Sequence, residues 1–171
     1  MWSLTFLLGC NPAPDPCTRV GIKVGECAPA LSLQQATGGE WTLEDHTGQV
    51  ILVQFAAAWC GVCQSLATQH QEIVDDYESE GFDKVTVLKG DLHFESVDQA
   101  EALEWSTYYN LSHPVLFDED RSAWKTWKRK TSSVPQQYLV DHKGAIRWRK
   151  VGRESEDELR EVIETHLSFR D

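Results

Sequence analysis

The sequence is poor in basic residues and contains no long apolar run. Only 16 of its 171 residues are Lys or Arg, against 27 Asp or Glu, so the formal net charge at pH 7 is −11. This imbalance argues against nucleic acid, whose phosphates would repel the chain, and against docking onto anionic lipid through a basic surface. No stretch approaches the ~18 apolar residues that a membrane-spanning helix needs.

The composition is otherwise that of an ordinary globular domain. Hydrophobic residues make up 41% of the chain and charged residues 25%. A chain of 171 residues suits one domain whose core needs no disulfide to hold it. We expect the acidity to serve solubility, and we expect most of the seven tryptophans to lie in the core or in the walls of a site.

The first ten residues, MWSLTFLLGC, carry a short apolar run that ends at Gly9 and Cys10. This order resembles a bacterial lipoprotein signal, in which cleavage after a small residue leaves the cysteine to carry lipid. No Lys or Arg precedes the run, and it is shorter than the usual signal core of about 7–15 residues. The alternative is an apolar N-terminus in a cytosolic protein. We predict a lipoprotein signal over residues 1–10, a proline-rich tether or extended arm over 11–23, and one folded domain over 24–171.

Strand and helix patterns alternate along this domain. Residues 50–57, VILVQFAA, are typical of a central strand buried on both faces. From Gln64 the apolar period becomes that of a helix, which Gly81 ends. The alternation predicts an α/β fold with a central mixed sheet flanked by helices. The remaining predicted elements are short strands within 31–44, strands at 85–88, 115–117, 137–140 and 145–148, and helices at 96–109 (capped by Ser96), 120–127 and 155–169.

Two cysteines, Cys60 and Cys63, stand where the buried strand ends and the first helix begins. Unpaired backbone N–H groups and the positive end of the helix dipole stabilise a thiolate at Cys60, and the thiolate is the attacking species. Cys63, one helical turn further on, is placed to attack a mixed disulfide that forms on Cys60 and so to release the product. The pattern therefore predicts a reactive dithiol.

Two other readings of this cysteine pair are weaker. A zinc site needs about four ligands, and the chain offers no second pair at similar spacing, since its six histidines are scattered singly. We therefore predict no metal, and we expect His70, on the apolar face of its helix, to be a core residue with a hydrogen-bond partner. A purely structural disulfide is disfavoured because so small a loop restrains little unfolded-chain entropy.

A second landmark is the pair Val134-Pro135, which immediately precedes the predicted strand QQYLV. A proline is tolerated at the first residue of any strand. Pro135 is a candidate site residue because the strand that it precedes should lie beside the strand that leads to Cys60.

The segments VGECAPALSLQQATGGEWTLEDHTGQVILVQFAAAWCGVC, NLSHPVLFDED and SSVPQQYLVDHKGAIRWRKVG resemble, in order, the blocks of the TlpA/ResA-type thioredoxin-like proteins. The resemblance spans roughly residues 24–167. It implies a thioredoxin-like fold with an N-terminal β extension and a helical insertion around residues 96–109. It also implies a cis Pro135, which puts the Val134 backbone beside the dithiol to pair with a substrate strand, and a Trp59 that covers one side of Cys60.

The chain departs from the family at three positions. Gln54 replaces the buried Asp with which thioredoxins move the proton of the inner thiol, and Leu66 stands where ResA-like members place a buried acid. Without either carboxylate Cys63 lacks an obvious proton acceptor, so we predict slow reduction near neutral pH that improves as the pH rises. Gln136 replaces the Thr usual after the cis-proline, which leaves substrate contacts there open.

The resemblance implies a thiol–disulfide oxidoreductase that reduces proteins on the periplasmic side of the bacterial cell envelope. It would use its own disulfide and no other cofactor, take electrons from a membrane dithiol donor, and work as a lipid-anchored monomer. The Gly61-Val62 dipeptide would help to set its potential. Cys17 and Cys27 could form a disulfide that pins the N-terminal arm in an oxidising compartment.

Other classes stay open at this point. A peroxidase of similar fold would carry Pro-x-x-x-Thr/Ser-x-x-Cys, but the residues before Cys60 are FAAAW. A copper-delivery protein of the Sco type would carry Cys-x-x-x-Cys and a distant histidine; His142 is available, but the cysteine spacing is short by one. A binding domain that merely kept the fold would be expected to have lost one of the two cysteines.

Overall fold

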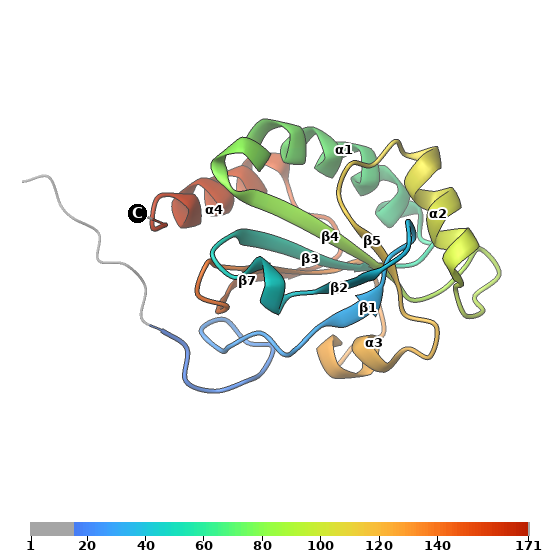
Figure 1. Cartoon of the computed structure of the whole chain (residues 1–171), viewed down its shortest axis with the longest axis horizontal. Coiled ribbons are helices and arrows are strands. Elements are labelled where there is room, and N and C mark those ends of the chain that lie inside the picture. Colours follow the sequence, from blue (N-terminus) through green and yellow to red (C-terminus); the bar gives the residue numbers. More distant parts are fainter. Residues whose placement is uncertain (1–15, 171) are drawn as a thin grey trace, which may run out of the picture.

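The computed structural model describes residues 16–170, which fold around a five-stranded mixed sheet (Figure 1). The strand order is β5-β4-β3-β6-β7, with β3, β4 and β5 parallel and β6 and β7 antiparallel to their neighbours. The α/β class and the mixed sheet predicted from the sequence are confirmed. The strands are β3 (Val50–Ala56), β4 (Phe82–Leu88), β5 (Val115–Phe117), β6 (Gln136–Val140) and β7 (Ile146–Val151).

Four helices surround the sheet. Figure 1 shows α1 and α4 together on one face, α3 on the opposite face, and α2 beyond the end of the sheet near β5. A separate hairpin, β1 and β2, supplies the expected N-terminal β extension and reaches β5 through a bridge between Gln35 and Leu116. The bounds are α1 (Gly61–Tyr77), α2 (Gln99–Tyr108), α3 (Ser122–Trp127), α4 (Glu156–Leu167), β1 (Ser32–Gln34), β2 (Glu40–Thr42) and the 3-10 turns η1 (Glu44–His46) and η2 (Glu78–Glu80).

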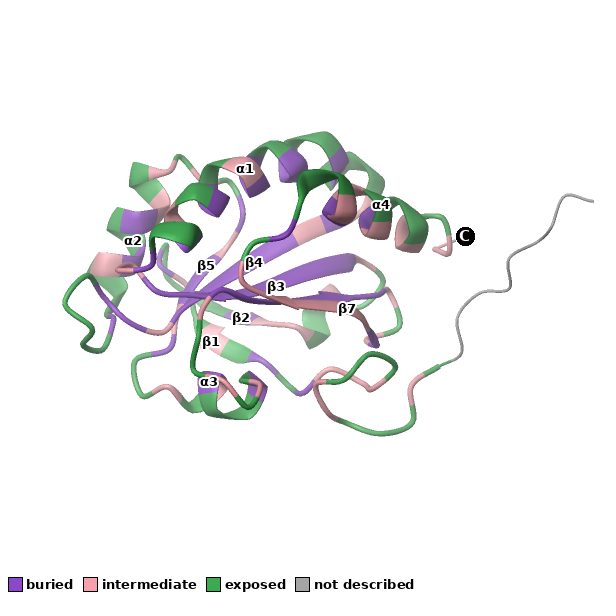
Figure 2. Ribbon diagram, turned by 180° about the vertical axis from the view of Figure 1, so that it is seen from behind, coloured by how far each residue is buried: buried purple, intermediate pink, exposed green. Residues whose placement is uncertain are grey.

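The central strand β3 is buried along its whole length, because helices cover both faces of the sheet (Figure 2). Val53 and Phe55 point toward α3, where Phe55 packs against Trp124 and Trp127. Leu52 and Ala56 point toward the face covered by α1 and α4. A continuous apolar run is therefore what this position in the sheet requires.

The first helix begins at Gly61, directly after its N-cap Cys60, as predicted for the dithiol. The starts of α2 and α3 differ from the sequence prediction, and α3 begins at Ser122 rather than at residue 120. The insertion helix α2 is capped by Asp98 and not by Ser96. The carboxylate of Asp98 accepts from the Glu101 backbone, and the Glu101 side chain accepts from the Asp98 backbone, which is a capping box.

The N-terminal arm is attached to the domain well before residue 24. A disulfide joins Cys17 to Cys27, and backbone hydrogen bonds join Gly21 to Cys27 and Cys27 to Arg19. Cys27 also bridges to Ala145 at the β6–β7 turn. From Cys17 onward, the described part of the predicted arm is thus joined to the domain by a disulfide and by backbone hydrogen bonds. None of the helices within residues 16–170 has the length and apolar character that crossing a bilayer requires.

Candidate functional site: a dithiol at a helix N-terminus

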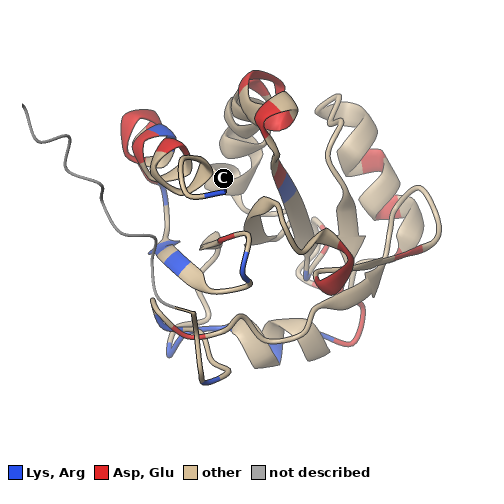
Figure 3. Cartoon of the chain, turned by 60° about the vertical axis from the view of Figure 1, so that its left-hand side comes forward, with Lys and Arg blue, Asp and Glu red and all other residues tan. Residues whose placement is uncertain are grey.

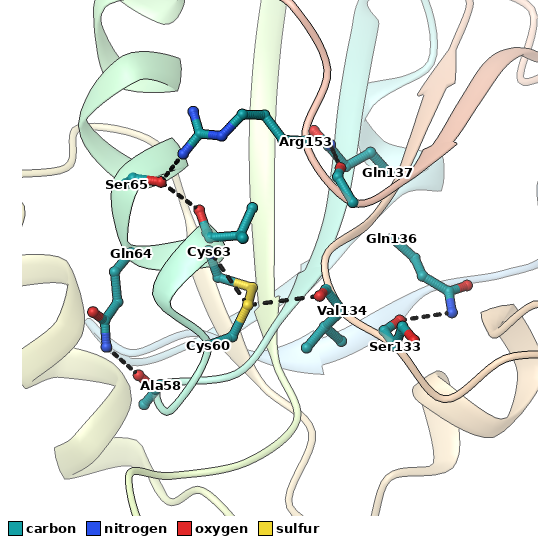
Figure 4. Close-up of a disulfide and its surroundings, with 12 residues drawn as sticks. Ala58, Cys60, Cys63, Gln64, Ser65, Ser133, Val134, Gln136, Gln137 and Arg153 are labelled. Carbon is teal, nitrogen blue, oxygen red and sulfur yellow. Dashed lines mark hydrogen bonds between the residues drawn. A yellow bond between two sulfur atoms is a disulfide. The ribbon is translucent and has the colours of Figure 1, made fainter.

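The two cysteines of the motif meet at the start of α1, where a disulfide joins Cys60 to Cys63 (Figure 4). Cys60 is the N-cap residue of the helix, with extended backbone angles, and its sulfur accepts a hydrogen bond from the Cys63 backbone N–H at 3.2 Å. In the reduced protein the same donor and the helix dipole stabilise a thiolate on Cys60.

Both cysteine residues are buried, Cys63 slightly more than Cys60. Cys60 is 6% exposed and Cys63 is 1% exposed, with Leu66 buried one turn beyond it. Gly61 and Val62, between the cysteines, are exposed. Both cysteines belong to the same hydrophobic cluster, and we expect an incoming disulfide to meet Cys60 first, because Cys60 is the N-cap residue beside the exposed Gly61 and Val62.

The loop before β6 closes the other side of the site. The Val134–Pro135 peptide bond is cis, as the resemblance implied, and the Val134 carbonyl oxygen lies 3.6 Å from the Cys60 sulfur. Trp59, half-buried, packs against the cluster that contains Cys60 and stacks on Phe94 with ring centroids 4.8 Å apart. The structure thus gathers Trp59, Cys60, Cys63, Val134 and Pro135 in one place.

A family model, described as the AhpC/TSA family, matches residues 24–149. The chain belongs to the AhpC/TSA family.

Individual relatives agree with this assignment. The chain is 28% identical to the thioredoxin-like protein YneN of Bacillus subtilis, with 85% of this chain and 82% of YneN aligned. It is 20% identical to the thiol-disulfide oxidoreductase ResA of Geobacillus thermodenitrificans, over 86% of this chain and 80% of the relative. A thioredoxin family protein of Chlorobium tepidum TLS, a thiol:disulfide interchange protein, superposes with a TM-score of 0.71 at 17% identity, covering 90% of this chain and 98% of that one. The thioredoxin-like fold and the TlpA/ResA-type resemblance are confirmed.

In this AhpC/TSA-family chain the departure at Gln136 has a structural role that the sequence did not reveal. The side chain is fully buried, and its amide nitrogen donates to the carbonyl oxygens of Thr131 and Ser133, each at 3.0 Å. Its oxygen accepts from the Arg129 backbone N–H at 2.8 Å. Gln136 therefore fastens the loop that carries Val134 from within, and it is not available to touch a substrate.

A buried polar layer crosses the sheet between the apolar cluster around Cys63 and a second apolar cluster under α4. In β3 it holds Gln54, which lies between Ala56 of the first cluster and Leu52 of the second. Gln54 pairs in register with Thr86 of β4 and Gln137 of β6. The amide nitrogen of Gln54 has no hydrogen-bond partner within the described residues.

A carboxylate enters this layer from a position that sequence reasoning missed. Glu154, on the loop between β7 and α4, is 4% exposed, and its carboxylate lies 2.6 Å from Nε2 of His70 and accepts from Gln137. Burial opposes ionisation of Glu154, but its hydrogen bonds with His70 and Gln137 prevail and lower its pKa. Burial also lowers the pKa of His70, against the influence of Glu154, so the pair is a neutral imidazole and a carboxylate. His70 is thus the partnered core residue that we predicted.

The layer continues to a buried lysine. Lys84 of β4 is 1% exposed; its ammonium donates to Thr86 at 2.7 Å and lies 3.1 Å from Nε2 of His113. Burial lowers the pKa of Lys84 to about 7. Burial and the neighbouring Lys84 hold the pKa of His113 well below its ordinary value. The face of the sheet behind the dithiol therefore carries ionisable groups although Gln54 and Leu66 are not acids.

The remaining predicted site residues lie elsewhere. Cys17 and Cys27 join the arm to the β6–β7 turn, at the end of β6 opposite to Pro135. Cys10 lies outside the described residues. Within residues 16–170 no group of three or more His, Cys, Asp or Glu side chains is placed to hold a metal ion.

Proposed function

We propose that this protein is a thiol–disulfide oxidoreductase that reduces disulfides of bacterial envelope proteins through Cys60 and Cys63. The observation that carries the proposal is the N-cap position of Cys60, with the Val134 carbonyl 3.6 Å from its sulfur. A sulfur in this position is activated by the helix and lies beside a main-chain acceptor of the half-buried Val134, with which an extended substrate can pair. The names of YneN, ResA and the Chlorobium interchange protein support the same reaction class.

The reaction balances with the two cysteines alone. The Cys60 thiolate attacks one sulfur of the substrate disulfide, and the other substrate sulfur leaves as a thiolate that takes a proton from solvent. Cys63, once deprotonated, attacks the Cys60 sulfur of the mixed disulfide, and the second substrate sulfur leaves. Two electrons have passed to the substrate, and the Cys60–Cys63 disulfide is the oxidised product. A membrane dithiol is proposed to return the electrons.

The envelope location rests on two further features. The sequence ahead of Cys10 resembles a lipoprotein signal, and the Cys17–Cys27 disulfide is of a kind that persists in oxidising compartments. We propose that Cys10 carries lipid and that the domain works as a monomer on the periplasmic side of the membrane. Radiolabelled palmitate should enter the wild-type protein in cells and not Cys10→Ser; equal labelling of both would place the lipid elsewhere.

The activity is tested by trapping. In cells that express Cys63→Ser, the mixed disulfide on Cys60 cannot be resolved, so protein partners should accumulate in a covalent complex that a thiol reductant dissolves. The matched control, Cys60→Ser, retains the inner thiol and should capture none. In vitro, the pre-reduced wild-type protein should reduce one peptide disulfide per molecule. If it consumes hydrogen peroxide rapidly and leaves the peptide oxidised, the protein is a peroxidase and our proposal is wrong.

A further inference from the structure

A cavity of about 410 Å³ opens beside the dithiol, between α2 and the segment from Ala58 to Gln64 that contains the two cysteines. Ala58 and Gln64, which flank the segment from Trp59 to Cys63, form one wall. The Gln64 amide donates to the Ala58 carbonyl at 2.7 Å and holds this wall together (Figure 4). A polypeptide bound at Cys60 would therefore have this cavity within reach of its neighbouring side chains.

The opposite wall is aromatic. Trp105, Tyr108 and Tyr109 of α2 and its C-cap line the cavity; the ring centroids of Trp105 and Tyr109 are 4.7 Å apart, and those of Tyr108 and Tyr109 are 4.9 Å apart. Trp105 is 7% exposed, yet its indole N–H has no hydrogen-bond partner within the described residues. A buried donor without a partner is costly, and the accessible part of this wall consists of the two tyrosine side chains.

The cavity is also negatively charged. Asp91, Glu101 and Glu104 line it, and no Lys or Arg does. Asp91 accepts from the backbone of the 93–95 loop, and Glu101 belongs to the capping box of α2. Glu104 is exposed and forms no ion pair within the part of the chain that the structure describes, so its charge faces solvent. Figure 3 shows acidic positions on α2 and no basic ones.

We infer that this cavity binds a Lys or Arg side chain of the polypeptide whose disulfide reacts with Cys60. This inference rests on the proposed function and adds a substrate preference to it. A cation placed there meets the carboxylate of Glu104 and the faces of the tyrosine rings, and both attract it.

The test uses three synthetic peptides that share one intramolecular disulfide and differ at a single flanking position, which holds Lys, Gln or Glu. The position is moved through the second, third and fourth residues from the cysteine. Pre-reduced protein is mixed with each peptide, and the second-order rate constant of peptide reduction is measured. At the best position we expect the Lys peptide to react about fivefold faster than the Glu peptide, with the preference weakening as ionic strength rises.

Variants of Glu104 test whether the preference for the Lys peptide arises in the cavity. Glu104→Gln should bring the ratio of the Lys and Glu peptide rates close to one, and Glu104→Lys should reverse it. The matched control is Glu161→Gln, which removes an exposed carboxylate from α4 and should keep the wild-type ratio. A wild-type ratio of one at all three positions overturns the inference, and so does a preference that survives Glu104→Gln unchanged.

A separate arm distinguishes this failure from failure of the proposed function. Bis(2-hydroxyethyl) disulfide carries no charged side chain to place in the cavity. If the reduced wild-type protein reduces this compound and all the peptides at charge-independent rates, only the substrate preference is wrong. If it reduces none of them, the proposed function itself is wrong.

Discussion

The two disulfides of this chain have different surroundings, although the bond is the same. The Cys60–Cys63 bond spans three positions at the N-terminus of a 17-residue helix, beside a main-chain carbonyl. The Cys17–Cys27 bond spans ten positions and is enclosed by backbone hydrogen bonds of the arm, with no helix start at either cysteine. A cysteine pair is redox-active when a helix N-terminus stabilises its thiolate. It is a structural disulfide when the surrounding backbone only holds the two sulfurs in place.

The largest expected effect separates the two pairs directly. Cys60→Ser should lower the rate of peptide-disulfide reduction to that of the buffer alone, because no other thiol occupies the helix N-cap. The double variant Cys17→Ser, Cys27→Ser should keep the wild-type rate. Stopped-flow measurement with pre-reduced protein decides this, and a double variant as inactive as Cys60→Ser would contradict the division of roles.

For the free energy of unfolding we expect the larger effect from loss of the Cys17–Cys27 disulfide. Closing a loop of about ten residues restricts the unfolded chain, so loss of the Cys17–Cys27 bond should lower the free energy of unfolding by ~3 kcal/mol. Urea titration of the double variant against the wild type, both with Cys60–Cys63 oxidised, measures this difference. An unchanged midpoint would show that the arm contributes nothing to the stability of the domain.

Gln54 lies behind the reactive cysteine pair, where a carboxylate would affect the reactive disulfide and not the structural one. Gln54→Asp would place a carboxylate in the polar layer, where it can take the proton of Cys63, so the release of substrate from the mixed disulfide at pH 7 should speed up about tenfold. The control Gln34→Asp puts the same charge on the exposed strand β1 and should change nothing. Equal release rates in Gln54→Asp and the wild type, followed across the pH range, would indicate that Glu154 or solvent already takes this proton.

The smallest effect concerns the pair of Glu154 and His70. Both pKa values are lowered in the folded protein, so the unfolded chain binds more protons as the pH falls. Their contribution to stability is therefore complete above the ordinary pKa of histidine and declines as the pH drops through about 6.5 and then 4.5. In urea midpoints measured between pH 7 and pH 4, Glu154→Gln should remove the part of the decline near pH 4.5 and keep or enlarge the part near pH 6.5, because Glu154 raises the pKa of His70. A profile identical to that of the wild type would remove the pair as its cause.

Some of this architecture follows from local pattern and some does not. The buried strand β3 and the cysteines at its end are readable because burial on both faces demands an apolar run and a helix start follows at once. The cap of α2 is ambiguous in the sequence, because Ser96 with Gln99 and Asp98 with Glu101 both have capping-box spacing, and the structure uses the second pair.

The polar layer and the acidic cavity could not be read in this way. Glu154 and His70 are 84 positions apart, and nothing in either segment indicates that α1 and the β7–α4 loop bring them together. The cavity likewise joins Ala58 and Gln64 to α2, and its charge is apparent only after the insertion helix has been placed. Long-range packing decides both features, so single-sequence periodicity is silent about them.

The hydrogen bonds of Gln136 to the loop that carries Val134 have a consequence for substrate binding. Because one internal amide holds three backbone groups of that loop, the Val134 carbonyl has its orientation before any partner arrives. A polypeptide that binds there meets a loop that is already ordered. The conformational entropy lost on association therefore comes mainly from the bound polypeptide. The main-chain acceptor beside Cys60 therefore has a fixed geometry that does not depend on the side chains of the bound polypeptide.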